Sequence, residues 1–252
     1  MIEPGAPSEL TIRAVALYLP ILVAVALALH RRPGDRRRCA AVLLATAWNL
    51  PALLIVNVVA IRAGWWTFAV SGGTLAGVPA DLWIGWALLW GAVPLLATVD
   101  RLAVAGAVLV AADLVLMPLG QPVVRLQSTW LVGEAVAVAT CMVPGLLLGR
   151  WTARGDHLAA RAALQVAAFT GLLIYVLPSL VFVVTGEDWG TLLARPRWHF
   201  VVAGLLVAPA AAMALQAVRE FVAGGGTPVP LDPPLRLVTA GPYAYVANPM
   251  QL

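Results

Sequence analysis

Two turn signals flank a short aromatic segment near the carboxyl end of the sequence. Gly241-Pro242 and Asn248-Pro249 are the turn signals, and Tyr243 and Tyr245 lie between them. Turns expose backbone amides, and a tyrosine ring next to them can stack on a flat ligand. This segment suits the binding of an adenine or a charged small molecule. It suits equally well a surface loop that is anchored by its tyrosine rings.

Four polar residues lie inside long apolar runs of the sequence. They are Asp113, Glu134, Asn49 and Asn57. An ionisable side chain at membrane depth is costly, which makes Asp113 a candidate for substrate binding. Asn49 and Asn57 are eight residues apart and therefore share one helix face, so Asn49 is a second candidate. The alternative is that these side chains only form hydrogen bonds between helices.

The composition places most of this chain in lipid. Of its 252 residues, 62% are hydrophobic and only 11% are charged, whereas a soluble domain carries roughly 25% charged residues. All 16 basic residues are arginine and lie near the ends of apolar runs, without a basic stripe, so nucleic acid is not an expected partner. The three histidines share no metal-ligand spacing, and we expect no metal.

The chain is predicted to be all-α, a polytopic transmembrane helical bundle with about seven helices in residues 1–220. A membrane helix needs about 20 apolar residues, and seven runs qualify. They are Ala14–His30, Cys39–Ile61, Leu82–Val99, Leu102–Pro118, Trp130–Gly149, Ala162–Thr185 and Phe200–Val218. Residues 221–252 are predicted to form a cytoplasmic strap rich in glycine and proline, because these residues block a helix.

Arginine counting predicts the orientation of the bundle. Alternating helices place 11 of the 16 arginines on one side, five of them in the first connection, at residues 31–38. Cytoplasmic loops carry the arginine excess, so we expect an outside N-terminus and a cytoplasmic C-terminal segment. The exclusive use of arginine and the richness in alanine, valine and leucine are typical of GC-biased bacterial coding. We therefore expect the bacterial inner (plasma) membrane.

Five tryptophans cluster around the connection that follows the second apolar run. They are Trp65, Trp66, Trp83, Trp86 and Trp90. Tryptophan is enriched at both membrane–water interfaces, so these residues are predicted to form an interfacial aromatic belt. A lipid-binding mouth is the alternative.

The strap resembles a known signature. Between Gly226 and Leu252 the sequence has the pattern GTPxPxxPPxxLVxxGPYxYVxNPMxL, which resembles the isoprenylcysteine carboxyl methyltransferase and phospholipid methyltransferase superfamily. These are integral membrane enzymes that use S-adenosyl-L-methionine. The resemblance implies cofactor-binding roles for Gly241, Pro242, Tyr243, Tyr245, Asn248, Pro249 and Met250.

The chain departs from this family at several positions. Ala244 and Ala247 replace usual arginines, Asn248 replaces a frequent histidine, and Gln251 replaces a usual tyrosine. The family continues beyond the signature into further membrane helices that carry a Glu-Glu pair. We therefore expect this chain to be a fragment of a longer protein.

The resemblance implies the transfer of a methyl group from S-adenosyl-L-methionine to a lipid-like or isoprenoid acceptor. It assigns no catalytic residue. The alternative is a non-enzymatic membrane protein that keeps the strap as a structural element, as a scaffold, a lipid-binding protein or a small transporter.

Overall fold

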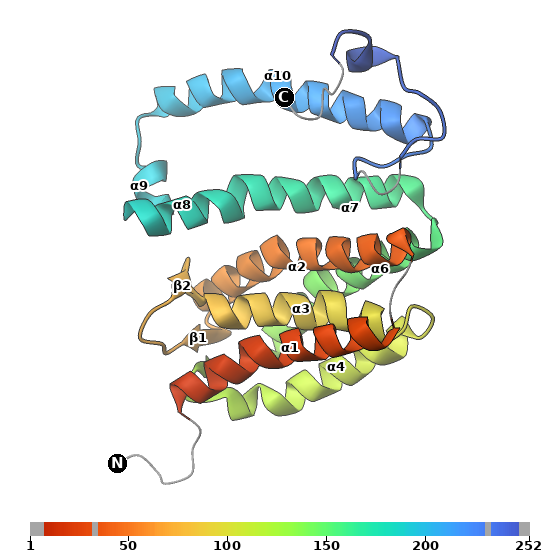
Figure 1. Cartoon of the computed structure of the whole chain (residues 1–252). Coiled ribbons are helices and arrows are strands. Elements are labelled where there is room, and N and C mark those ends of the chain that lie inside the picture. Colours follow the sequence, from red (N-terminus) through yellow and green to blue (C-terminus); the bar gives the residue numbers. More distant parts are fainter. Residues whose placement is uncertain (1–7, 32–34, 230–232, 247–252) are drawn as a thin grey trace.

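The computed structural model describes residues 8–31, 35–229 and 233–246, and within them the fold is all-α, as predicted (Figure 1). The α-helices are α1 (Glu9–Arg31), α2 (Arg36–Ala63), α3 (Ala80–Ala97), α4 (Leu102–Leu116), α5 (Trp130–Ala137), α6 (Val143–Arg154), α7 (Leu158–Gly171), α8 (Leu177–Thr185), α9 (Trp189–Leu193) and α10 (Arg197–Ala223). Two π-helical segments, η2 (Val138–Met142) and η3 (Leu172–Val176), join α5 to α6 and α7 to α8. Short 3-10 helices are η1 (Pro118–Gly120) and η4 (Gly241–Ala244).

Six helical runs in the described residues are long and apolar enough to cross a membrane. They are Glu9–Arg31, Arg36–Ala63, Ala80–Ala97, Trp130–Arg154, Leu158–Thr185 and Arg197–Ala223. The fourth predicted run forms α4, which has 15 residues. Its length of about 22 Å is less than the hydrocarbon core of about 30 Å. The described residues therefore form a helical membrane protein with six helices long enough to cross the bilayer and one shorter apolar helix.

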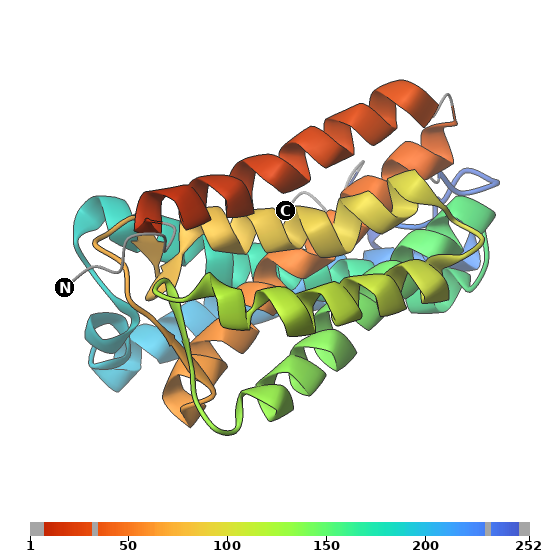
Figure 2. The same cartoon turned by 90° about the horizontal axis from the view of Figure 1, so that it is seen from below.

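The long helices run in alternating directions, so successive connections lie at opposite ends of the bundle (Figures 1 and 2). The connections after α1, α3 and α6 share one end, where Arg154 donates to Asp100 at 3.0 Å. This end carries most of the arginines, and we call it the arginine-rich end. The connections after α2 and α4 meet at the other end.

Helix α2 lies at the centre of the bundle and is approached by a glycine from each of three helices. A Cβ atom on Gly91 of α3 would lie 2.7 Å from the Cα of Thr46. On Gly145 of α6 it would lie 2.6 Å from Nδ2 of Asn49, and on Gly171 of α7 it would lie 2.7 Å from Cβ of Pro51. Small residues let membrane helices approach closely and gain van der Waals contact.

Prolines in the helices leave carbonyl groups that other elements must satisfy. Pro144 has no N–H for the carbonyl of Thr140, four residues earlier. The indole of Trp48 on α2 donates to that oxygen at 3.1 Å. The π-helical segments η2 and η3 come directly before the turns that contain Pro144 and Pro178, which is the kind of local adjustment that makes proline tolerable in a membrane helix.

Two short antiparallel ladders, which the sequence did not predict, lie at the end opposite the arginine-rich end. β1 (Trp66–Phe68) pairs with β4 (Val124–Leu126), and β2 (Thr74–Leu75) pairs with β3 (Val78–Pro79). Between β2 and β3, Ala76 and Gly77 both have positive φ, as in a two-residue hairpin turn. The β1–β4 ladder ties the connection after α2 to the connection after α4.

The predicted tryptophan belt is wrong for three of its five members. Trp66, Trp83 and Trp90 are buried in the bundle. The indole of Trp83 donates to the carbonyl of Leu50 at 2.7 Å, and the indole of Trp66 donates to Asn57 Oδ1 at 2.9 Å. These two side chains face inward because their N–H groups find partners on α2, and they fill the space between helices.

The contact at Gly91 gives a stability test. Gly91→Ala should destabilise the bundle by about 1–3 kcal/mol, because the added methyl meets the backbone of α2 and cannot be accommodated by rotating a side chain. Unfolding of the purified protein in detergent measures the effect. Gly204→Ala on α10 is the matched control, since a Cβ there meets nothing within 4 Å. Equal stability of both variants would contradict the close approach.

Candidate functional site

A small cavity lies between α2, α3, α4 and α5, near the end opposite the arginine-rich end. Its volume is about 20 Å³, and Asp113, Glu134, Asn57 and Trp90 are among the residues that line it. Asp113 is 9% exposed and Glu134 4% exposed. The cavity thus gathers polar side chains from four helices inside an otherwise apolar bundle.

The two carboxyl groups of the cavity interact directly. Asp113 and Glu134 line the same cavity, and their carboxyl groups are close enough to interact. An ionised carboxylate only accepts hydrogen bonds, so a hydrogen bond between these two groups requires a proton on one of them. Oε1 of Glu134 is buried and has no hydrogen-bond partner among the described residues. Glu134 therefore keeps one buried oxygen without a partner in the described part of the chain, beside the Asp113 carboxyl group.

Asn57 has a structural role at this cavity. Its Nδ2 donates to the carbonyl of Leu53 at 2.8 Å, and its Oδ1 accepts from the indole of Trp66 at 2.9 Å. Both ends of the amide are thus engaged, and the side chain holds the Trp66 ring against the cavity.

The structure does not bring Asn49 to the same cavity as Asp113. Asn49 lies eight residues before Asn57, about 12 Å along the helix axis. Its Nδ2 donates to the carbonyl of Ala45 at 2.8 Å, and its Oδ1 is buried with no partner among the described residues. The two predicted substrate-binding residues therefore belong to different places in the bundle. Glu134, which the sequence did not rank as a site residue, is the actual neighbour of Asp113.

The C-terminal motif folds back onto α10 at the arginine-rich end (Figure 1). Its turn, η4 (Gly241–Ala244), places the Tyr243 ring 5.3 Å from the ring of Phe221 on α10, centroid to centroid. The hydroxyl of Tyr243 is buried without a partner among the described residues, and this burial raises the pKa of Tyr243 above its ordinary value. Pro242 is also buried.

The other motif residues differ in their placement. Tyr245 is 91% exposed. Asn248, Pro249 and Met250, for which the resemblance implies cofactor contacts, lie outside the described residues. Gly241 has φ +59°, in the left-handed region that favours glycine.

Two polar residues of α10 that the sequence did not single out lie beside this turn. A Cβ atom on Gly241 would be 3.2 Å from Cγ of Glu220 and 3.4 Å from Nε2 of Gln216. Gln216 and Glu220 are four residues apart and so share one face of α10. A polar pair at that spacing in the last turns of an apolar helix is the sequence signal that would have found them.

The strap between α10 and the motif is anchored in the bundle. Val229 is buried against Leu44 of α2 and Leu148 of α6. Thr227 is fully buried, and its hydroxyl has no partner among the described residues. The amide of Leu235 donates to the carbonyl of Gly224 at 3.0 Å, which closes the strap on itself.

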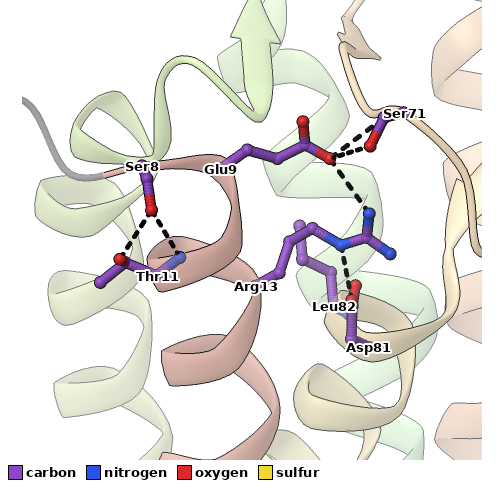
Figure 3. A network of polar contacts seen from close by, with 7 residues as sticks. All are labelled: Ser8, Glu9, Thr11, Arg13, Ser71, Asp81 and Leu82. Atoms are coloured by element: carbon purple, nitrogen blue, oxygen red, sulfur yellow. Dashed lines mark hydrogen bonds and ion pairs between the residues drawn. The ribbon is translucent and has the colours of Figure 1, made fainter.

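A separate polar network joins α1 to α3 (Figure 3). Arg13 donates to Asp81 at 2.6 Å and to Glu9 at 3.1 Å, and Glu9 accepts from the backbone N–H of Ser71 at 3.1 Å. The network borders a hollow of about 430 Å³. Since the Arg13 guanidinium binds one carboxylate on its own helix and one on α3, this network holds α1 to α3.

Comparisons with family models, with curated proteins and with solved structures found no match to this chain. The likeness to membrane methyltransferases therefore depends on the C-terminal motif alone. In the described part of the chain, no group of three or more His, Cys, Asp or Glu side chains could hold a metal ion.

The bond between Trp66 and Asn57 gives a test of the cavity wall. Trp66→Phe should lower the free energy of unfolding by about 1–3 kcal/mol, because it leaves the buried Asn57 carbonyl without its donor. Trp198→Phe is the matched control, since Trp198 is 61% exposed. Unfolding in detergent measures both variants, and an unchanged stability of Trp66→Phe would contradict this hydrogen bond.

Proposed function

We propose that this chain is an integral membrane S-adenosyl-L-methionine-dependent methyltransferase that acts on a lipid-like or isoprenoid acceptor. The observation that carries the proposal is the sequence pattern from Gly226 to Leu252, whose residues resemble the family signature in type and in order. Its described part does not extend away from the molecule but packs on α10 and on the end of the bundle.

The surroundings of the motif turn fit the chemistry of such a cofactor. S-adenosyl-L-methionine supplies a methyl group on a sulfonium, and its transfer to an oxygen or nitrogen atom leaves a neutral thioether. A carboxylate and aromatic ring faces attract a sulfonium cation, and Glu220, Phe221 and Tyr243 provide them beside Gly241. The buried Tyr243 hydroxyl has no partner among the described residues, and a bound cofactor would supply the missing hydrogen bond.

The task of these residues is positioning. Methyl transfer is an in-line displacement, in which the rate depends on holding donor and acceptor in contact and in line. The turn at Gly241 holds Tyr243 on Phe221, and Val229 fixes the strap between α2 and α6. Both contacts reduce the freedom of the segment that would hold the cofactor.

The location of the strap also supports the proposal. It lies at the arginine-rich end, which the distribution of arginine assigns to the cytoplasm, where S-adenosyl-L-methionine is dissolved. Helix α10 presents large exposed apolar side chains, among them Leu205 and Leu206. An acceptor dissolved in the bilayer would approach along this surface, while the cofactor enters from the aqueous side.

Cofactor binding is the direct test. The full-length protein in detergent should bind S-adenosyl-L-methionine in calorimetry, and Glu220→Gln should weaken binding about 10-fold, because it removes a charge beside the sulfonium. Gly241→Ala should weaken it as well, since a Cβ at this φ is strained and meets Glu220. Gly204→Ala, on the same helix, is the matched control and should bind like the unmodified protein.

A protein that binds no S-adenosyl-L-methionine at millimolar cofactor would overturn the proposal. The strap would then be a structural element of a non-enzymatic membrane scaffold, lipid-binding protein or small transporter.

A further inference from the structure

The cavity between α2, α3, α4 and α5 contains a polar atom that the carboxyl pair does not explain. Nε1 of Trp90 is buried and has no hydrogen-bond partner among the described residues, and Trp90 is 2% exposed. Both Trp90 and Glu134 line the cavity. A buried donor on α3 and a buried acceptor, Glu134 Oε1, on α5 thus border the same space.

The size of the cavity limits its occupant. A water molecule needs roughly 10–15 Å³ of such volume, and this cavity has about 20 Å³. The cavity is lined by three tryptophans, Trp66, Trp86 and Trp90, and by two carboxyl groups. Aromatic rings and carboxylates together would suit an organic ammonium ion. The volume excludes that ligand and leaves room for one species of the size of water.

The polar groups decide between water and a metal cation. The Trp90 N–H is only a donor, so it needs an acceptor and disfavours a cation. Water accepts from Trp90 while it donates to Glu134. Two ionised carboxylates without a basic partner would be very costly at this depth, and neither arginine nor histidine lines the cavity. A shared proton removes one of these charges.

The carboxyl pair is the titratable unit of this region. Of the residues that line the cavity, Asp113 and Glu134 are the titratable ones, and Asn57, Trp66, Trp86 and Trp90 are neutral. Cys141 of η2 also interacts with Glu134. A thiol is neutral unless it is deprotonated, so it does not supply the missing positive charge.

We propose that Asp113, Glu134 and Trp90 form a membrane-embedded proton-binding site. The carboxyl pair holds one proton between its two groups, and one water molecule in the cavity links Glu134 Oε1 to Trp90 Nε1. The site takes up and releases this proton as one unit. It is independent of the C-terminal motif and of any methyl transfer.

Infrared spectroscopy of the full-length protein tests the site. At neutral pH the protein should show one band of a buried, protonated carboxyl group, and the double variant Asp113→Asn/Glu134→Gln should lack it. Each single variant should shift or remove the band, because the remaining group loses its carboxyl partner. Asp188→Asn is the matched control, since Asp188 is exposed and caps α9 through the Thr191 N–H, and the band should stay unchanged.

Trp90→Phe tests the water link and keeps both carboxyl groups. The band should be present and shifted, because the indole no longer orders the water that donates to Glu134. A missing band in the unmodified protein, or one that persists in the double variant, would refute the proton site. An unchanged band in Trp90→Phe would refute the water link.

Discussion

The close approach of three helices to one short stretch of α2 is the constraint on which the bundle depends. Between Ala45 and Pro51, α2 meets Gly91 of α3, Gly145 of α6 and Gly171 of α7, each without room for a Cβ atom. In lipid, burial of apolar surface does not favour one helix contact over exposure to acyl chains, so close packing provides the selectivity. These three contacts set the distances of the helices around α2.

That arrangement also decides where polar groups find partners. The carbonyl of Thr140, which Pro144 cannot engage, accepts a hydrogen bond from the indole of Trp48. The carbonyl of Leu50 accepts one from the indole of Trp83. Both bonds join α2 to a neighbouring helix. Because the hydrocarbon offers no hydrogen bonds, each such group must be satisfied inside the protein. Several buried polar atoms have no partner among the described residues, and two of them, Glu134 Oε1 and Trp90 Nε1, belong to residues that line one cavity and for this reason point to a ligand.

The two regions that could bind a ligand, the carboxyl pair and the C-terminal motif turn, lie at opposite ends of the bundle. The carboxyl pair lies near the β1–β4 ladder, which draws the connection after α4 back to α2 and so positions α5. The motif turn lies on α10 at the arginine-rich end. Asp113 was identifiable from the sequence as a charge in an apolar run. The sequence did not show that Asp113 lies beside Glu134 and away from Asn49. The periodicity of a helix does not specify how two helices are rotated against each other.

The sequence by itself determined that the chain lies in lipid, where its helices lie along the chain and that the last long helix ends near residue 220. These features depend on hydropathy, proline and glycine, which act locally. Only the tertiary structure decided which side of each helix faces inward. Trp66, Trp83 and Trp90 suit a membrane interface by composition, yet they are buried. Gln216 and Glu220 are visible in the sequence as a polar pair near the end of an apolar helix, but only the structure shows that they lie beside Gly241. In both cases the outcome depends on contacts between residues far apart in the chain, which local pattern does not encode.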